Sequence, residues 1–225
     1  MPDLNFKVES VEAIAYSVSP LLNFKVSVTN ADAAEAIQSV MLRCQIQIET
    51  TRRQYNPDEQ AKLLDLYGEP SRWGQTLKTL LWTHSNVVVQ QFTGSTVIDL
   101  PVVCTFDFNV ATTKYFNGLE GGEIPLCLLF SGTAFYYDEN GALQVGQISW
   151  EKEANYRLPI GVWKQMMDMY YPNSVWLNIR RDVFENLQDF KMRQSIPSWE
   201  QALESLLPAN DDILADTVIT GGGAN

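Results

Sequence analysis

The fold is decided by the stretch Ser39–Glu49, which reads Ser-Val-Met-Leu-Arg-Cys-Gln-Ile-Gln-Ile-Glu. From Leu42 onward apolar and polar residues alternate, which is the two-residue period of a strand with one buried and one wet face. A helix would scatter the same side chains around its circumference. Because a sheet must cover its apolar face, the stretch predicts an antiparallel sheet with a second layer packed on it.

The same alternation recurs elsewhere and predicts the other strands: residues 4–9, 21–28 and 96–108, and a long hairpin of central strands over 124–150. Pro101 cannot donate a ladder hydrogen bond, so we expect its strand either to lie at a sheet edge or to begin again after the proline. Asn140-Gly141 is the dipeptide that a tight hairpin turn favours, since both turn positions need positive φ. The strands therefore predict a mainly β, α+β fold with C-terminal helices, in which a small helical layer covers an antiparallel β-sandwich.

Helical signals are a start at Asn56-Pro57, a short segment at 109–119, the periodic segments 159–171 and 181–193, and a capping box at Ser198. The helical period is expected from Trp150 onward, with one more short strand at 175–179. We predict a single β-sandwich domain over residues 1–207, whose helical C-terminal part covers about 159–207. A disordered tail is expected over 208–225.

The composition excludes several classes of function. The net charge of −11 among 225 residues repels phosphate backbones and anionic lipid, so we expect neither nucleic acid nor a membrane as a partner. No apolar run has the length of a membrane span, and the first residues lack the pattern of a signal peptide. We therefore expect an acidic cytoplasmic protein. The sequence leaves its oligomeric state open.

The residues that usually carry chemistry are scarce. His84 is the single histidine, and no glycine-rich phosphate loop or nucleophile elbow is present. Cys44, Cys104 and Cys127 lie far apart in strand-like runs, which predicts three buried free thiols. We therefore expect no metal site, no cofactor and no catalytic residue, although the sequence does not settle whether the protein is an enzyme.

Methionine and aromatic residues gather on the segment from Trp163 to Trp176, and they suit either a buried helix or the centre of an interface. The loop that contains Arg72 and Trp73 suits either a packed loop or a contact loop. The candidate partner-binding residues are Trp163, Met166, Met167, Met169, Tyr170, Tyr171, Trp176, Arg72 and Trp73.

Several short segments of the sequence occur together in a combination that is typical of a known family. Among them are Gly68-Glu69-Pro70-Ser71-Arg72-Trp73-Gly74, Gly122-Glu123-Ile124-Pro125-Leu126, Leu129-Phe130-Ser131-Gly132-Thr133 and Tyr156-Arg157-Leu158-Pro159. Together they resemble a bacterial family known only as a domain of unknown function, over nearly the whole chain to about Leu207. The resemblance implies no assigned reaction. It also implies a gene neighbourhood near nickel–iron hydrogenase genes, and hence an accessory or assembly role.

Three functions are compatible with these patterns. The first is a non-catalytic binding or assembly accessory protein that holds a protein partner or peptide, with a possible link to hydrogenase maturation or function. The second is an enzyme or small-ligand binder with a pocket between sheet and helices, which would use His84 with a carboxylate. The third is a holdase-type chaperone, which would accept many unrelated unfolded chains.

Overall fold

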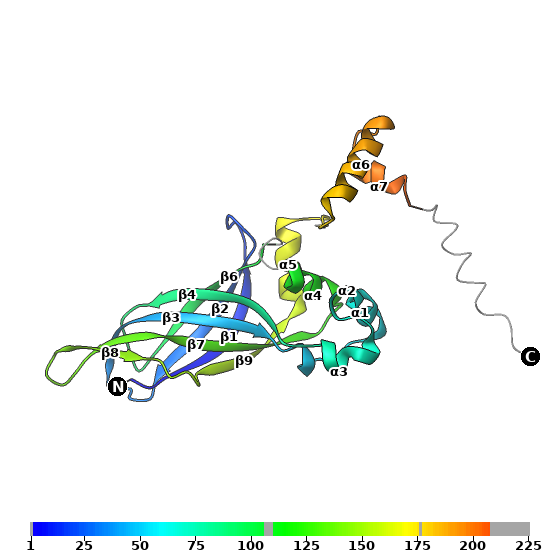
Figure 1. The fold of residues 1–225 in the computed structure, drawn as a ribbon. Helices are drawn as coiled ribbons and strands as arrows, with labels where there is room; N and C mark the ends of the chain where they lie inside the picture. Colours follow the sequence, from blue (N-terminus) through cyan, green and yellow to red (C-terminus); the bar gives the residue numbers. More distant parts are fainter. Residues whose placement is uncertain (1, 106–109, 176, 208–225) are drawn as a thin grey trace, which may run out of the picture. The chain divides into compact units, whose positions relative to one another are not determined.

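The structure is a computed structural model, and it describes residues 2–105, 110–175 and 177–207 (Figure 1). The chain divides into two compact units, Met1–Ser174 and Val175–Asn225. The predicted domain of residues 1–207 spans both units. The predicted disordered tail, residues 208–225, lies outside the described residues.

Two antiparallel sheets form most of the first unit (Figure 1). The smaller has the order β1 (Leu4–Ile14), β2 (Leu21–Asn30) and β6 (Ser95–Val103). The larger has the order β4 (Leu80–Val89), β3 (Ala36–Ile48), β7 (Glu123–Tyr137) and β8 (Leu143–Gln147), with β5 (Phe92–Thr93) on β3 and β9 (Glu153–Pro159) on β7. The predicted mainly β, α+β class is confirmed.

Strand β3 lies between β4 and β7, and its buried face is the one that the alternation predicts. Its inward side chains are almost fully buried: Leu42, Cys44, Ile46 and Ile48. Rings from the two sheets meet in the core, where Phe6 stacks on Phe130 with centroids 4.3 Å apart. Phe24 likewise meets Trp82 edge to face at 6.2 Å. The two sheets therefore pack on each other around one shared core.

The helices of the first unit are α1 (Pro57–Lys62), α2 (Leu64–Tyr67), α3 (Trp73–Thr76), α4 (Val110–Gly118) and α5 (Ile160–Tyr170), with 3₁₀ turns η1 (Thr50–Arg52) and η2 (Pro70–Arg72). Helices α1 to α4 gather at one end of the sheets (Figure 1). Trp82 of β4 contacts Phe116 of α4 at 5.0 Å, and Phe116 contacts Trp163 of α5 at 5.1 Å. Helices and sheets therefore share the same apolar core.

A buried ion pair fixes the start of α1 to the loop before β7. The Asn56 side chain caps the helix through a capping box with Glu59, which confirms the predicted helix start. The Glu59 carboxylate also accepts a hydrogen bond of 2.6 Å from Arg53, and both side chains are less than 10% exposed. Arg53 donates further to the carbonyl oxygens of Gly121 and Glu123. These hydrogen bonds offset most of the desolvation free energy that burying the two charges costs.

The β7–β8 hairpin differs from its prediction in two ways. Only Gly141 of the expected Asn140-Gly141 pair has positive φ, because the loop is one residue longer than a two-residue turn. It is closed by a hydrogen bond from Asp138 N–H to the carbonyl of Ala142, a geometry in which one left-handed residue is enough. The hairpin also does not consist of two central strands, since β8 is at an edge of the sheet.

Other predictions have mixed outcomes. Pro101 does lie in an edge strand, β6, and residues 109–119 do contain a helix, α4. The helical period expected from Trp150 was wrong, because β9 occupies residues 153–159 before α5 begins. Over the described part of residues 175–179 the chain forms no strand. The second unit contains α6 (Arg181–Arg193) and α7 (Trp199–Glu204), close to the predicted helices.

Gly132 permits the close approach of β7 to β3 and generates the first testable prediction. Its φ is +146°, and an added Cβ would lie 2.1 Å from the carbonyl oxygen of Met41. We expect Gly132→Ala to lower the free energy of unfolding by about 3 kcal/mol, from strain and forced strand separation. Gly74→Ala is the matched control, because an added Cβ at Gly74 would meet open space. Urea denaturation of both variants measures the difference, and equal midpoints would contradict the packing described.

Candidate functional site

Helix α5 carries most of the predicted contact residues, and the structure places three of them inside the first unit. Trp163, Met166 and Met167 are 4%, 0% and 8% exposed and belong to the apolar core. The wide apolar arc of α5 is therefore covered largely within the first unit. A partner could reach these three side chains only if α5 left the sheets. Their role in partner binding stays a prediction.

The last turn of α5 holds the loop between β1 and β2. The Tyr170 hydroxyl accepts a hydrogen bond of 2.7 Å from Ser17 N–H and donates one of 2.9 Å to the carbonyl of Ile14. Tyr171 is half-buried, whereas Met169 is 43% exposed. Trp176 lies outside the described residues. Of the predicted set on this segment, Met169 is thus the described side chain most accessible to a partner.

Arg72 and Trp73 lie where η2 meets α3. The Trp73 indole N–H donates to the carbonyl of Gly68 at 2.9 Å, and its ring meets the Tyr55 and Tyr67 rings edge to face. Trp73 is therefore mainly a packing residue. Arg72 is exposed, so it is the member of this pair that a partner can contact.

The position of His84 bears on the arrangement predicted for an enzyme. The imidazole is exposed on β4, and its Nε2 lies 3.2 Å from the side-chain oxygen of Gln45 on the neighbouring β3. Gln45 is an amide, so it cannot orient or charge the imidazole as a carboxylate would. His84 lines none of the described pockets. The described residues therefore give no support to an enzyme that uses His84 with a carboxylate, and that hypothesis stays a prediction.

The three cysteines are buried and free, as predicted. Burial raises the pKa of the Cys44 thiol and of the Cys104 thiol to about 12, because the thiolate would lose its solvation. The pKa of Cys127 is raised too, first by burial and then by the charge of Glu153. None of these thiols has the electropositive, accessible surroundings of a reactive cysteine.

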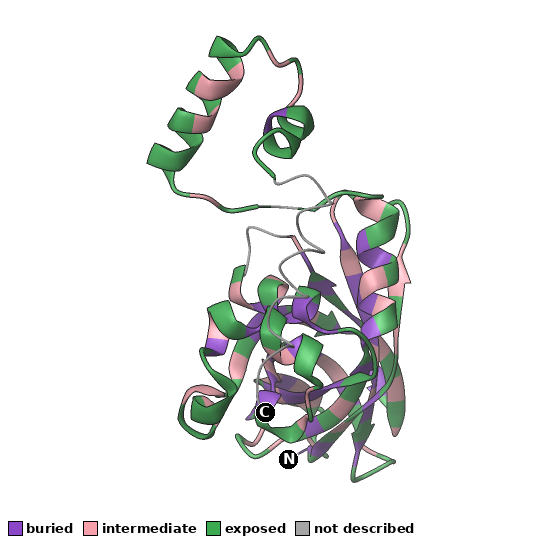
Figure 2. Cartoon of the chain, turned by 90° about the vertical axis from the view of Figure 1, so that its right-hand side faces the viewer, coloured by how far each residue is buried: buried purple, intermediate pink, exposed green. Residues whose placement is uncertain are grey.

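Apolar side chains also gather on the second unit, where sequence reasoning did not place a contact surface. Most are exposed: Val183, Phe184, Met192, Trp199, Leu203, Leu206 and Leu207. In the described part of this unit, α6 has no buried residue and α7 has only Ala202 (Figure 2). The amphipathic pattern was visible in the sequence. What it could not show is that the two helices bury so little against each other.

The two helices are nevertheless well formed at their ends. The chain leaves α6 through Ser195 at φ +54°, with hydrogen bonds from Ile196 N–H to Lys191 and from Ser195 N–H to Met192, which is a Schellman motif. Ser198 then caps α7. The Phe184 and Trp199 rings lie 5.3 Å apart and join the helices. The pair is thus a defined helical hairpin, and most of its large apolar side chains are exposed.

The burial of α5 generates a stability prediction. We expect Trp163→Ala to lower the free energy of unfolding by about 3–5 kcal/mol, because it empties a large site in the core. Met169→Ala, one turn and a half further along the same helix but exposed, should change stability by less than about 0.5 kcal/mol. Thermal and urea unfolding of both variants provide the measurement. Similar losses in the two variants would mean that α5 is not packed as described.

Burial of the thiols generates a third prediction. In the folded protein at pH 8, a disulfide reagent should modify Cys44 and Cys104 far more slowly than in urea, since the reactive thiolate is scarce when the pKa is about 12. Absorbance of the released thiolate gives the rates. Rapid modification of the native protein would contradict the burial of these side chains.

Comparison with known proteins gives a family but no activity. A family of unknown function, DUF6084, matches residues 1–214. No curated protein matches the chain. None of the described helices has both the length and the hydropathy that crossing a bilayer requires.

The solved structures that are similar to the chain resemble it only weakly. A CARDB domain from Pyrococcus furiosus, solved in complex with di-metal ions, is 13% identical, with 70% of this chain and 92% of that chain covered and a TM-score of 0.28. A protein assigned to the late embryogenesis abundant class is 16% identical, with 71% and 73% covered and a TM-score of 0.32. At such scores neither likeness carries an argument about function. The family model, by contrast, matches residues 1–214, and the chain therefore belongs to the family of unknown function DUF6084.

Proposed function

We propose that this protein is a non-catalytic accessory or assembly protein that binds a partner protein through the apolar side of the α6–α7 hairpin. The observation that carries the proposal is that this hairpin exposes its large apolar side chains and, among its described residues, buries only Ala202. An exposed apolar surface on a well-formed element is typical of a site that another molecule covers.

The energetics of a two-helix unit support this proposal. Helix α6 has 13 residues, and isolated helices of that length are marginal in water. Caps and one aromatic contact add about 1 kcal/mol each, which does not replace a hydrophobic core. The folded hairpin has no hydrophobic core of its own, so a partner that buries its exposed apolar side chains would supply most of the free energy that stabilises it. Binding and folding of this unit are then coupled.

The charges of α6 favour a hydrophobic groove in the partner as the receptor. Its polar side chains include both signs, with Asp182 and Asp189 beside Arg180 and Arg193. Such a mixed surface gives no strong steering toward a charged target. The apolar residues at positions 183, 187 and 190 instead have the spacing of a helix that lies in a groove.

The finer form of the proposal concerns the identity of the partner and the compartment. The gene neighbourhood implied by the family resemblance leads us to propose a subunit or assembly intermediate of a nickel–iron hydrogenase, bound in the cytoplasm. An accessory role fits a chain whose described residues include no group of three or more metal-binding side chains.

A photo-cross-linking experiment tests the proposal in cells. A photoreactive amino acid at position 206 of the full chain should give one predominant cross-linked protein, identified by mass spectrometry. Position 97 is the control, because Val97 is 60% exposed on the first unit and Leu206 is 52% exposed on the second. Adding Leu203→Ser and Leu207→Ser should reduce the adduct about tenfold or more, since each removes an apolar contact.

Two outcomes contradict the proposal. Equal adducts at positions 206 and 97 would show that the hairpin is no preferred contact. Many unrelated, unfolded chains at position 206 would indicate a holdase in place of a specific assembly protein. A single partner that is not a hydrogenase subunit would overturn only the finer form.

A further inference from the structure

Strand β8 has a free edge that is not blocked. Among the described residues it pairs with β7 alone, and its sequence Leu-Gln-Val-Gly-Gln contains no charge and no proline. Natural sheets usually protect their edges with such residues or with bulges. The edge strand β1 has a bulge between Val8 and Ser10, and the edge strand β6 contains Pro101. Strand β8 has neither device.

The hydrogen bonds of the β7–β8 hairpin show which backbone groups are available. Asp138 bonds to Ala142 at the hairpin end, and Ile148 bonds to Gly132 at the other. In an antiparallel ladder the bonded pairs alternate, so residues 144 and 146 of β8 also bond to β7. The N–H and C=O groups of Leu143, Val145 and Gln147 therefore point away from the sheet. They are the groups that an added strand would bond.

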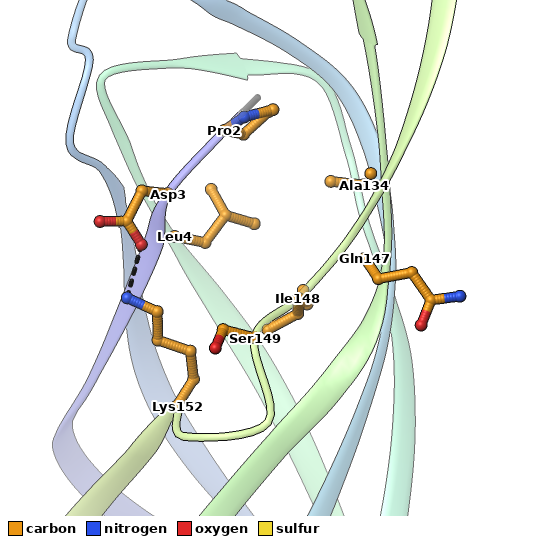
Figure 3. Close-up of a pocket in the computed structure, with 9 residues that line it drawn as sticks. Pro2, Asp3, Leu4, Ala134, Gln147, Ile148, Ser149 and Lys152 are labelled. Atoms are coloured by element: carbon orange, nitrogen blue, oxygen red, sulfur yellow. Dashed lines mark ion pairs between the residues drawn. The ribbon is translucent and has the colours of Figure 1, made fainter.

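A pocket of about 220 Å³ lies beside this edge (Figure 3). Leu4 and Pro2 of the N-terminal segment lie on one side, and Ala134 and Gly146, which face each other across the β7–β8 ladder, lie on the other. The two small residues leave the space open. Its volume exceeds the roughly 150 Å³ that suffices to hold a benzene ring in an apolar cavity. The Asp3–Lys152 ion pair stands at its rim (Figure 3).

The pocket lies on the face of the sheet toward which one side chain of an added strand would point. In a pleated sheet, residues directly opposite each other have their side chains on the same face. A residue opposite Gly146 in an added strand would therefore point toward the pocket. Its two neighbours would point to the other face, beside Val145 and Gln147, which are both exposed. Main-chain bonding with a pocket for an alternate side chain is the recurrent pattern of strand addition.

Charge identifies the chemistry of the added strand. Carboxylates flank β8 at both ends, with Asp138 and Glu139 in the hairpin and Glu151 and Glu153 beyond residue 148. A second copy of this chain is disfavoured, because antiparallel pairing of two β8 strands would bring the carboxylates at the hairpin end of each copy near those beyond residue 148 of the other. A segment with basic residues at its ends would meet complementary charge at both.

We propose that the free edge of β8 receives an extended segment of a partner protein, in which a large apolar or aromatic side chain fills the pocket and lysine or arginine residues flank it. The inference rests on the proposed protein-binding function, to which it adds a second contact surface and the chemistry of its ligand. It does not depend on the α6–α7 hairpin.

The test is fluorescence anisotropy with the full chain and short labelled peptides. The probe has a central Phe between Val and Thr residues and Lys-Arg pairs at both ends. We expect saturable binding that weakens at high salt, and at least a tenfold loss when the central Phe becomes Ala or the basic ends become Glu. No binding of the probe, or equal binding of the three peptides, would overturn the inference.

Protein variants locate the site. Val145→Pro removes an N–H that β7 does not use, so it should weaken the probe at least tenfold, while Val145→Ala should have little effect. Ala134→Leu should remove the preference for Phe over Ala, because it fills the pocket. Near-UV circular dichroism checks that each variant is folded. Unchanged binding by both Val145→Pro and Ala134→Leu would place the peptide elsewhere and overturn the inference.

Two controls separate this inference from the function proposed above. Leu203→Ser with Leu207→Ser should leave the peptide affinity unchanged within about twofold, and Val145→Pro should leave the adduct at position 206 unchanged. Sedimentation of the wild-type chain tests the alternative occupant. A dimer that Val145→Pro dissociates would show that a second copy occupies the edge, and would overturn the inference while leaving the hairpin proposal intact.

Discussion

The fold depends on one constraint, which is that β3 must hide one face along its whole length. Its inward side chains are buried by the smaller sheet, and its neighbours β4 and β7 are held in register on both sides. A slip of one residue would turn every apolar side chain of the strand toward water. Gly132 serves the same constraint, since only a residue without a side chain lets β7 lie so near Met41.

Local pattern predicted much of this architecture from the sequence. Alternation in the stretch around Cys44 identified the central strand, and Asn56-Pro57 identified the start of α1, because each signal depends on neighbours in the chain. The sequence did not predict which strands pair with each other. Strand β8 alternates like a central strand, but among the described strands it pairs only with β7, so it lies at the edge.

The candidate sites were harder to predict for the same reason. The apolar arc of α5 indicated correctly that something must cover both flanks, but Trp163 and Met166 are covered by the sandwich itself. The pocket beside β8 brings residues 2–4 together with residues 134, 146–149 and 152, and no local pattern links such distant segments. Ala134 and Gly146 matter there because they are small. Absence of a side chain leaves no signal of periodicity.

Tyr170 gives the first unit a mechanical property. The chain leaves this unit just after α5, and the Tyr170 hydroxyl bonds that helix end to the backbone at the end of β1 and inside the β1–β2 loop. A force that a bound partner applied to the chain after α5 would act on these two hydrogen bonds before it acted on the sheets.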